Sequence, residues 1–208
     1  MSDQEKMSTN VAIRSTLEAI TEIMGDKGAK IIFRSADLAH IFETPPDYSF
    51  APCITVRDQA RILFEVENLV GLTGALGIWR RIGFTVIRYA EEVGRVGDSL
   101  KGLSPDERFL KSLEILSAAS GRGRPVVRES GEVNFDNFNC QLCEGRKMNR
   151  PMCSFYEGVT QHLLDLAYGR GEYIAQETKC MGVGDDTCFY TFSKKSDNAV
   201  VLKIRIQH

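Results

Sequence analysis

The sequence predicts an α+β protein, in which amino-terminal helices pack on an antiparallel sheet formed mainly by the carboxyl-terminal half. Apolar residues recur at helical spacing as far as Gly121, the spacing then changes to alternation, and glycines and prolines separate the segments. Because 208 residues suffice for one domain with a substantial core, we expect a flexible segment over residues 1–8 and a single domain over 9–208.

Four or five helices are expected before the first strand. They run from a Thr9 or Asn10 cap to Gly25, from Ala29 to Phe42, from a Thr55 cap through Val70, from Gly74 through Val93, and from a Ser104 cap to about Gly121. Pro45 and Pro46 end the second helix, since proline cannot continue it. The order Ser104, Pro105, Glu107 is typical of a capping box with a first-turn proline.

Strands are expected mainly after residue 121. Pro125–Val127 and Glu132–Phe135 flank Ser130 and Gly131, which is a hairpin pattern. A further helix is predicted from Pro151 to Tyr168. The remaining predicted strands are Tyr173–Glu177, Cys188–Phe192 and Val200–Ile206.

Composition indicates a soluble, cytoplasmic protein. The net charge is -2, and lysines and arginines are scattered, so we expect no nucleic-acid partner. No apolar run approaches the roughly 20 residues that span a bilayer, and the polar start is unlike a signal peptide, so we expect no membrane partner. In a reducing compartment the six cysteines suit thiols or metal ligands, although an oxidised pair of Cys140 and Cys143 stays open.

One stretch predicts a metal site. Glu177, Cys180 and Cys188 follow E-x2-C-x7-C spacing, and Cys153 lies upstream at the start of a predicted helix. Three sulfurs and one oxygen are a full tetrahedral set for Zn2+. Glu177 and Cys180 would point to opposite faces of a continuous strand, so their convergence requires the strand to end near Thr178.

Other interpretations of the thiols remain open at this point. Free cysteines are often small buried hydrophobes. Cys140 and Cys143 form a CxxC chelate, which with Cys180 and Cys188 would make a tetrathiolate site that leaves out Glu177. The CxxC also suits a thiol redox pair, or an iron-sulfur cluster with Cys153 as a third ligand.

The segment from about residue 150 to 193 resembles the 4-vinyl-reductase domain family, most closely in Met152 to Gly158 and in Glu177-x2-Cys180-Met-Gly-x-Gly-Asp185-Asp-x-Cys188. The resemblance implies an α+β fold related to haem nitric-oxide sensors and transport-particle subunits, usually as a homodimer. In phenol-sensing activators of this kind the matching residues bind a structural zinc. It therefore favours Cys153, Glu177, Cys180 and Cys188 as ligands, with Cys140 and Cys143 as alternative additional ligands. Such a closed, thiolate-rich site is a poor Lewis acid, which favours a structural role.

The resemblance also implies an apolar pocket. The aromatic residues that could line it, although most suit a plain core, are Trp79, Phe84, Phe109, Phe155, Tyr156 and Tyr173. The related haem sensors use an axial histidine with a Tyr-x-Ser-x-Arg clamp, and this chain has no such clamp. His40 and His162 lie outside any nucleophile motif, and no nucleotide-binding loop is present.

We therefore expect a zinc-stabilised, non-enzymatic domain that binds a small hydrophobic molecule, either a tetrapyrrole intermediate or an aromatic hydrocarbon, as a sensor or carrier. The enzyme alternative is a vinyl reductase, or its accessory protein, in (bacterio)chlorophyll synthesis. A third alternative is an assembly subunit. The amino-terminal helices carry more apolar residues than one buried stripe needs. We therefore predict that these helices form the contact of the homodimer.

Overall fold

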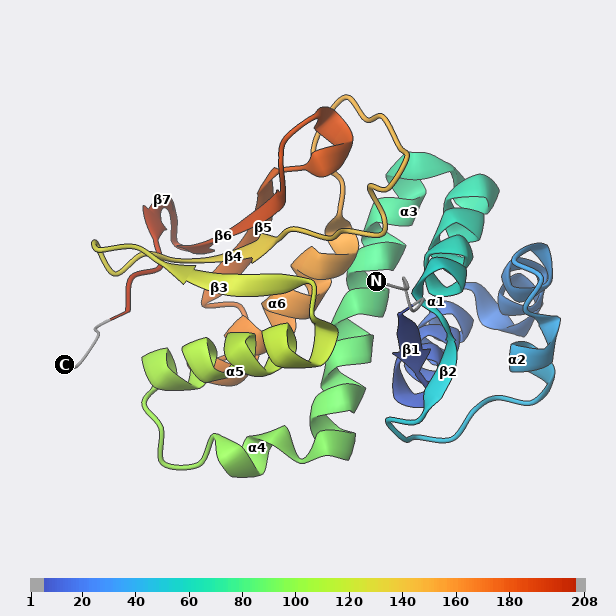
Figure 1. The fold of residues 1–208 in the computed structure, drawn as a ribbon, viewed down its shortest axis with the longest axis horizontal. Helices are drawn as coiled ribbons and strands as arrows, with labels where there is room; N and C mark the ends of the chain where they lie inside the picture. The colour runs from blue at the N-terminus through green and yellow to red at the C-terminus, as the bar shows by residue number, and fades with distance from the viewer. Residues whose placement is uncertain (1–5, 205–208) are drawn as a thin grey trace, which may run out of the picture. The chain divides into compact units, whose positions relative to one another are not determined.

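A computed structural model of the chain describes residues 6–204 and confirms the α+β class, with helices dominating the first half and an antiparallel sheet in the second (Figure 1). The chain divides into two compact units, Met1–Val96 and Gly97–His208. We call them the amino-terminal unit and the carboxyl-terminal unit.

The amino-terminal unit is built on two long helices that pack against each other. Its elements are β1 (Met7–Thr9), α1 (Asn10–Ser35), α2 (Ala39–Glu43), β2 (Pro52–Thr55) and α3 (Val56–Gly94). As predicted, the Thr55 hydroxyl caps α3 by accepting a hydrogen bond from the Asp58 amide at 3.0 Å. Trp79 is fully buried in this unit and donates its indole N–H to the Leu63 carbonyl at 2.9 Å.

Glycine interrupts both long helices. Gly25 in α1 has φ 70° and ψ 171°, and Gly71 in α3 has φ 72° and ψ 162°. Residues with a Cβ rarely adopt this conformation, so a helical segment ends at each glycine and another begins beyond it. The predicted stop at Gly25 is confirmed, and the two helices predicted over residues 55–93 meet at Gly71.

The helix predicted from Ala29 to Phe42 is wrong in its middle. α1 ends at Ser35, Asp37 adopts a left-handed φ of 59°, and the chain resumes as the short helix α2. The Asp37 amide donates to the Arg34 carbonyl and the Leu38 amide to the Phe33 carbonyl, which is the Schellman pattern of a helix end. An aspartate tolerates this conformation better than most residues but is a weaker sequence signal than glycine.

The flexible segment predicted over residues 1–8 does not extend through Met7 and Ser8; residues 1–5 lie outside the described residues. β1 pairs with β2 in an antiparallel two-stranded sheet. The Ser8 hydroxyl is buried and donates to the Gln59 side chain at 2.9 Å. Such pairing between distant segments leaves little periodic signal in three residues, which explains the error.

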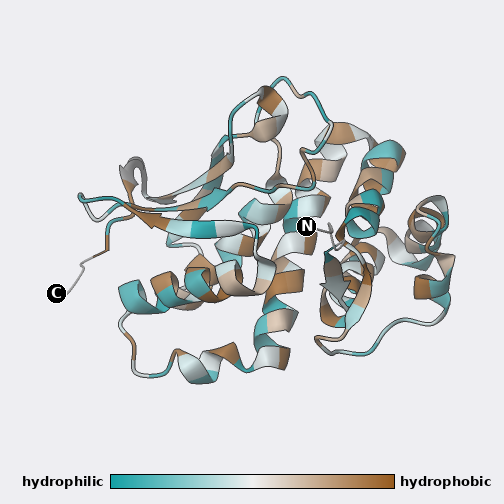
Figure 2. Cartoon of the chain, in the orientation of Figure 1, coloured by the Kyte–Doolittle hydropathy of each residue, from teal (hydrophilic) through white to brown (hydrophobic). Residues whose placement is uncertain are grey.

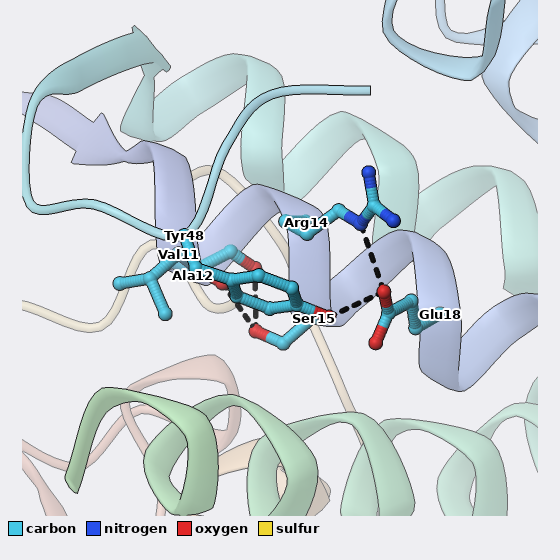
Figure 3. Close-up of polar contacts among 6 residues, drawn as sticks. All are labelled: Val11, Ala12, Arg14, Ser15, Glu18 and Tyr48. Carbon is cyan, nitrogen blue, oxygen red and sulfur yellow. Dashed lines mark hydrogen bonds and ion pairs between the residues drawn. The ribbon is translucent and has the colours of Figure 1, made fainter. Parts of the chain in front are cut away.

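A polar cluster holds the loop between α2 and β2 against α1 (Figure 3). The Glu18 carboxylate accepts hydrogen bonds from the Tyr48 hydroxyl and from the Arg14 guanidinium, the latter at 2.8 Å. The Tyr48 ring stacks on Tyr89 of α3, with 5.2 Å between centroids. The ring contact and the hydrogen bonds fix this loop on both long helices.

By length and composition α3 is the one helix among residues 6–204 that could cross a membrane. This is a weak indication, because the core helix of a soluble protein passes the same criterion. Gly71 interrupts the helix, and the side chains of Trp79 and Ile82 are fully buried. The absence of a membrane partner stays a prediction.

The carboxyl-terminal unit is a sheet covered by two helices. After α4 (Val96–Ser99), its elements are α5 (Pro105–Ser120), β3 (Gly123–Val127), β4 (Val133–Asn137), α6 (Ser154–Tyr168), β5 (Tyr173–Lys179), the 3-10 helix η1 (Met181–Val183), β6 (Cys188–Lys194) and β7 (Asp197–Val201). The strand order is β3-β4-β6-β5, with β7 also paired to β6, and every pairing is antiparallel. α5 contacts β3, α6 contacts β5, and the two helices contact each other, so both cover the same face. Figure 2 shows apolar and polar residues alternating along α5, as expected of a helix with one buried side.

Most predicted elements of this unit are confirmed. Ser104 and Glu107 form the predicted capping box at the start of α5. The predicted hairpin corresponds to β3 and β4, and the predicted helix and next two strands correspond to α6, β5 and β6. The last strand is displaced, since β7 ends at Val201 where Val200–Ile206 was predicted; residues 205 and 206 lie outside the described residues. Leu202 and Ile204 are nevertheless buried and Lys203 is exposed, in agreement with the predicted alternation.

Candidate metal centre

Five cysteines and one glutamate of the carboxyl-terminal unit converge in one buried cluster, which we call the thiol cluster. Cys140 and Cys143 come from the loop after β4, Cys153 from the N-cap of α6, Glu177 from β5, Cys180 from the residue after β5, and Cys188 from the first residue of β6. All six side chains are buried, with Cys180 and Cys188 fully so. The sixth cysteine, Cys53, lies in β2 of the amino-terminal unit.

A β-bulge brings Glu177 and Cys180 to the same side. The sequence predicts that β5 ends near Thr178, but the strand continues to Lys179. Glu177 pairs with Tyr190 and Lys179 with Phe189, which are adjacent in β6. Between these two pairs β5 therefore contains one residue more than β6. An extra residue reverses the alternation of side chains, so Glu177 and Cys180 can point to the same side of the sheet. The bulge, and not only an end of the strand, brings these two side chains together.

The turn after β5 is shaped by a carboxylate and two glycines. The Cys180 amide donates to the Asp185 carboxylate at 2.8 Å, and Gly184 has a φ of 108°. Gly182 is required for space, because a Cβ there would lie 2.9 Å from the sulfur of Met148. The Met148 amide donates to the Gly182 carbonyl at 2.7 Å, which joins this turn to the loop that carries Cys140 and Cys143.

The sulfur atoms are closer than unbonded thiols usually lie. The Sγ of Cys153 is 3.0 Å from that of Cys143, 3.3 Å from that of Cys140 and 3.8 Å from that of Cys188. The Sγ of Cys143 is also 3.5 Å from those of Cys180 and Cys188. A disulfide bond is about 2.05 Å long, whereas two thiolates on one tetrahedral zinc lie about 3.8 Å apart given a Zn–S bond of about 2.3 Å. The distances of 3.5 and 3.8 Å are close to those of thiolates around a shared ion, whereas 3.0 and 3.3 Å are shorter than that and longer than a disulfide bond.

Glu177 places a buried carboxyl group in the cluster, and one of its oxygens has no hydrogen-bond partner. Its Oε2 accepts the Cys153 amide at 2.7 Å, and its backbone amide donates to Glu157 at 2.9 Å. Its Oε1 is buried and has no hydrogen-bond partner. Burial raises the pKa of Glu177 to about 8. A buried oxygen without a partner is costly, and coordination to a cation would remove that cost.

The pKa values of neighbouring thiols move in opposite directions. Hydrogen bonds from Cys143, Cys153 and Cys188 hold the pKa of Cys140 well below its ordinary value, whereas contacts with Cys140 and Cys143 raise the pKa of Cys153. Each thiolate disfavours ionisation of the next, so the thiols can all ionise only when a cation offsets their charge.

Two four-donor sets meet the geometric requirement for a metal ion. One is the predicted set of Cys153, Glu177, Cys180 and Cys188, and the other consists of Cys140, Cys143, Cys153 and Cys188. The donor atoms within each set lie within 4.8 Å of one another. The second set differs from the predicted tetrathiolate, because Cys153 takes the place of Cys180. The CxxC spacing was the sequence signal for Cys140 and Cys143, but it did not indicate that both sets share Cys153 and Cys188.

No family model matches the chain, and no curated protein sequence is similar to it. Solved structures of H-NOX domains are similar in fold. One, from work on heme distortion in the H-NOX family, has a TM-score of 0.61 and 14% identity, covering 96% of this chain and 100% of that one. An H-NOX protein from S. oneidensis in the Fe(II)NO ligation state has a TM-score of 0.59 and 9% identity, covering 89% and 98%. An oxygen-binding H-NOX domain related to soluble guanylate cyclases has a TM-score of 0.52 and 14% identity, covering 86% and 89%.

These similarities establish the fold, which agrees with the relation to haem nitric-oxide sensors expected from the sequence. The 4-vinyl-reductase assignment itself stays a prediction. Haem is the group that this fold would imply, but the residues here do not fit its ligation as in those sensors. His40 is exposed, His162 is buried within α6, and the chain has no Tyr-x-Ser-x-Arg motif.

Proposed function

We propose that residues 9–208 act as a non-catalytic domain that binds a small hydrophobic molecule and is stabilised by zinc in the thiol cluster. The observation that carries the zinc assignment is the convergence of Cys153, Glu177, Cys180 and Cys188 from α6, β5 and β6 with a carboxylate oxygen lacking any partner. Their side chains come from the start of α6, the end of β5 and the start of β6, so an ion bound by them would join a helix to two strands.

A structural role suits this donor set better than a catalytic one. Three thiolates and a carboxylate occupy all four positions of a tetrahedral ion, and catalytic zinc usually keeps one position for water. Cys153 is the N-cap of α6, and the positive end of a helix dipole favours the negative charge of such a site. The Met181 amide also points to the Cys188 sulfur, at 3.4 Å.

The hydrophobic ligand is proposed from the fold. The similar H-NOX structures are of proteins described as binding haem or oxygen, and the family resemblance implies an apolar pocket. Because axial ligation by histidine does not fit this chain, a tetrapyrrole would be held by apolar contacts without an iron–histidine bond. Aromatic hydrocarbons are the other candidate class.

Native mass spectrometry and thermal shift test this function together. We expect the freshly purified protein to carry zinc, and a porphyrin or a mono-aromatic compound to raise the melting temperature by mass action. Metal-free protein with a full complement of thiols would remove the zinc assignment. If no compound of either class stabilises the protein, the ligand-binding proposal fails. The alternative that the protein is an assembly subunit then takes its place. Turnover of a divinyl tetrapyrrole with NADPH would instead require an enzyme.

We also propose a cytoplasmic homodimer. The amino-terminal unit exposes apolar side chains on its long helices, among them Ile23 and Ile31 of α1 and Leu69 and Val70 of α3. Exposed apolar residues on adjacent helices suit a second buried face. Light scattering at micromolar concentration should give twice the mass of the 23.2 kDa chain, and a monomer mass would remove this proposal.

A further inference from the structure

The carboxyl-terminal unit buries a positive charge that no carboxylate pairs with. Arg122 lies between α5 and β3 and is only 8% exposed. Within the part of the chain that the structure describes, no carboxylate lies at ion-pair distance from its guanidinium, whereas Arg124 lies 3.4 Å from Asp136. Arginine is almost never this buried without a partner, because an uncompensated charge away from water is costly. A negatively charged group is therefore expected near this side chain.

The register of the sheet places Arg122 at the end that carries the thiol cluster. β3 begins with Gly123, which pairs with Asn137 of β4, and Asn137 in turn pairs with Cys188 of β6. These three residues form one row across the sheet, and residues in such a row share a face. Arg122 precedes this row by one residue, so it enters the sheet beside the strand ends that supply the cluster.

Tyr156 lies between Arg122 and the cluster in electrostatic terms. It follows Cys153 by one turn of α6 and is buried. Burial raises the pKa of its phenol to about 12, the charge of Arg122 and a hydrogen bond with its guanidinium act in the opposite direction, and the charges of Cys140 and Cys153 add to the increase. Its ring also lies 6.1 Å from that of Tyr190, whose hydroxyl donates to the Cys153 carbonyl at 3.4 Å. The phenol is therefore within reach of both the guanidinium and the thiols.

A metal ion in the cluster would leave a negative charge for Arg122 to offset. Either donor set, three thiolates with a carboxylate or four thiolates, carries four formal negative charges, and one zinc ion offsets two of them. The net charge is the same whichever set holds the ion. Such charge is costly away from water unless a positive group lies nearby, and a buried guanidinium supplies one.

A buried donor without an acceptor lies on the same face of the sheet. The Asn137 Oδ1 accepts the Asn139 amide at 3.3 Å, but its Nδ2 is buried and has no acceptor. Asn137 is the register partner of Cys188, so it shares a face with that ligand. An N–H group without an acceptor favours an anion in its surroundings. A positive charge and an unpaired donor thus both lie where the metal centre would be negative.

We propose that Arg122 is the counter-charge of the metal centre, a positioning residue that does not touch the ion but raises zinc affinity from behind Tyr156. This inference rests on the proposed function, since it assumes that the cluster binds zinc. It adds to that function a residue outside the ligand set that controls how tightly the ion is held. Groups that surround a metal site without binding it typically contribute about 10- to 100-fold in metal affinity.

Zinc affinity of matched variants tests this role. Competition with a chromophoric chelator should show about 10- to 100-fold weaker zinc binding for Arg122→Met, which keeps a long side chain and removes the charge. Arg122→Lys keeps the charge and should retain most of the affinity. Arg124→Met is the matched control, because it removes the same charge from an exposed side chain, and it should bind zinc as the wild type does.

Melting temperatures with and without zinc separate this role from a general structural one. Arg122→Met should lower the melting temperature of the zinc-loaded protein, because the ion is held less tightly. It should not lower that of protein stripped of zinc by a chelator, because a buried guanidinium gains nothing when no anionic centre is present. An equal decrease in both forms would overturn the proposal.

The remaining outcomes also decide. Equal zinc affinity of Arg122→Met and the wild type would overturn the counter-charge and leave the proposed zinc site intact. An Arg122→Lys protein that loses as much affinity as Arg122→Met, or an Arg122→Met protein that does not fold with zinc in excess, would show that the shape of the side chain matters and not its charge. Wild-type protein that binds no zinc would remove the proposed zinc site itself, and this inference with it.

Discussion

The two units of this chain are stabilised by different means. The amino-terminal unit buries apolar side chains between α1 and α3, with Trp79 at its centre, and its polar cluster lies at the loop that contains Tyr48. The carboxyl-terminal unit also has an apolar core, but six buried side chains that could bind a metal meet at one end of its sheet. Packing can hold the first unit, whereas the second brings together groups whose ionised forms repel one another unless a cation offsets their charge. Removing a ligand and removing a core side chain should therefore affect different units.

Loss of the metal should have the largest effect, and it should be confined to the carboxyl-terminal unit. We expect Cys188→Ser to remove the metal and to destabilise this unit by about 5 kcal/mol or more, because the free energy of metal binding is coupled to folding. Amide hydrogen exchange should show loss of protection in β5 and β6 and little change in α1. Cys53→Ser should leave both units unchanged. Equal loss of protection in both units would contradict the comparison.

The metal should also be lost on acidification, because zinc binds thiolates and not thiols. We expect zinc release as the pH falls, followed by unfolding of the carboxyl-terminal unit. Protein in which the thiols have been freed of metal by a chelator should lack this transition. A zinc content that stays constant in strong acid would argue against thiolate ligands.

Removal of the central aromatic residue should produce the opposite pattern. Trp79→Ala should cost roughly 3–5 kcal/mol, since it leaves a cavity and removes the donor to the Leu63 carbonyl. Denaturant unfolding would measure this cost, and mass spectrometry should find the metal content unchanged. Trp79→Phe should cost less because it keeps most of the packing. Loss of metal in Trp79→Ala would show that the units are not independent in this respect.

The helix break in the amino-terminal unit offers a smaller test. Gly71→Ala should cost about 1–3 kcal/mol, because alanine is strained at φ 72° and ψ 162°. Gly77 is the matched control, since it lies in the regular part of α3 and nothing lies within 4 Å of an added Cβ. Gly77→Ala should be neutral or stabilising by up to about 1 kcal/mol. Similar melting temperatures for the two variants would mean that Gly71 does not need its unusual conformation.

The capping box of α5 should give the smallest effect. Ser104→Ala should cost about 1 kcal/mol, or about 2–4 °C in melting temperature for a domain of this size. Hydrogen bonds from Ser104 lower the pKa of Glu107, so the folded state favours its ionised form, and this contribution should be present at neutral pH and be lost on acidification. Glu107→Gln keeps an acceptor for the Ser104 amide and should remove that pH dependence. A melting temperature of Ser104→Ala equal to that of the wild type would show that the cap is dispensable.

Local signals in the sequence predicted most of the elements. The Thr55 cap, the Ser104 capping box and the stop at Gly25 depend on residues within four positions of one another, so their chemistry can be read without the fold. The errors fall where the decisive contact is distant or where an unusual residue adopts a special conformation. β1 exists because it pairs with β2, and Asp37 ends a helix without the glycine that would have marked the stop.

The sequence by itself determined which side chains could bind a metal, since the spacing of Glu177, Cys180 and Cys188 and the CxxC of Cys140 and Cys143 are visible in it. Only the tertiary structure decided that all of them meet in one buried place and that Cys153 and Cys188 belong to both sets. The physical reason is that the meeting of these side chains depends on the register of β5 against β6, on the bulge after Glu177 and on where α6 begins, and these are set by contacts between separate elements. Spacing along the chain limits which donors can reach an ion, but distances in space decide which of them can share one.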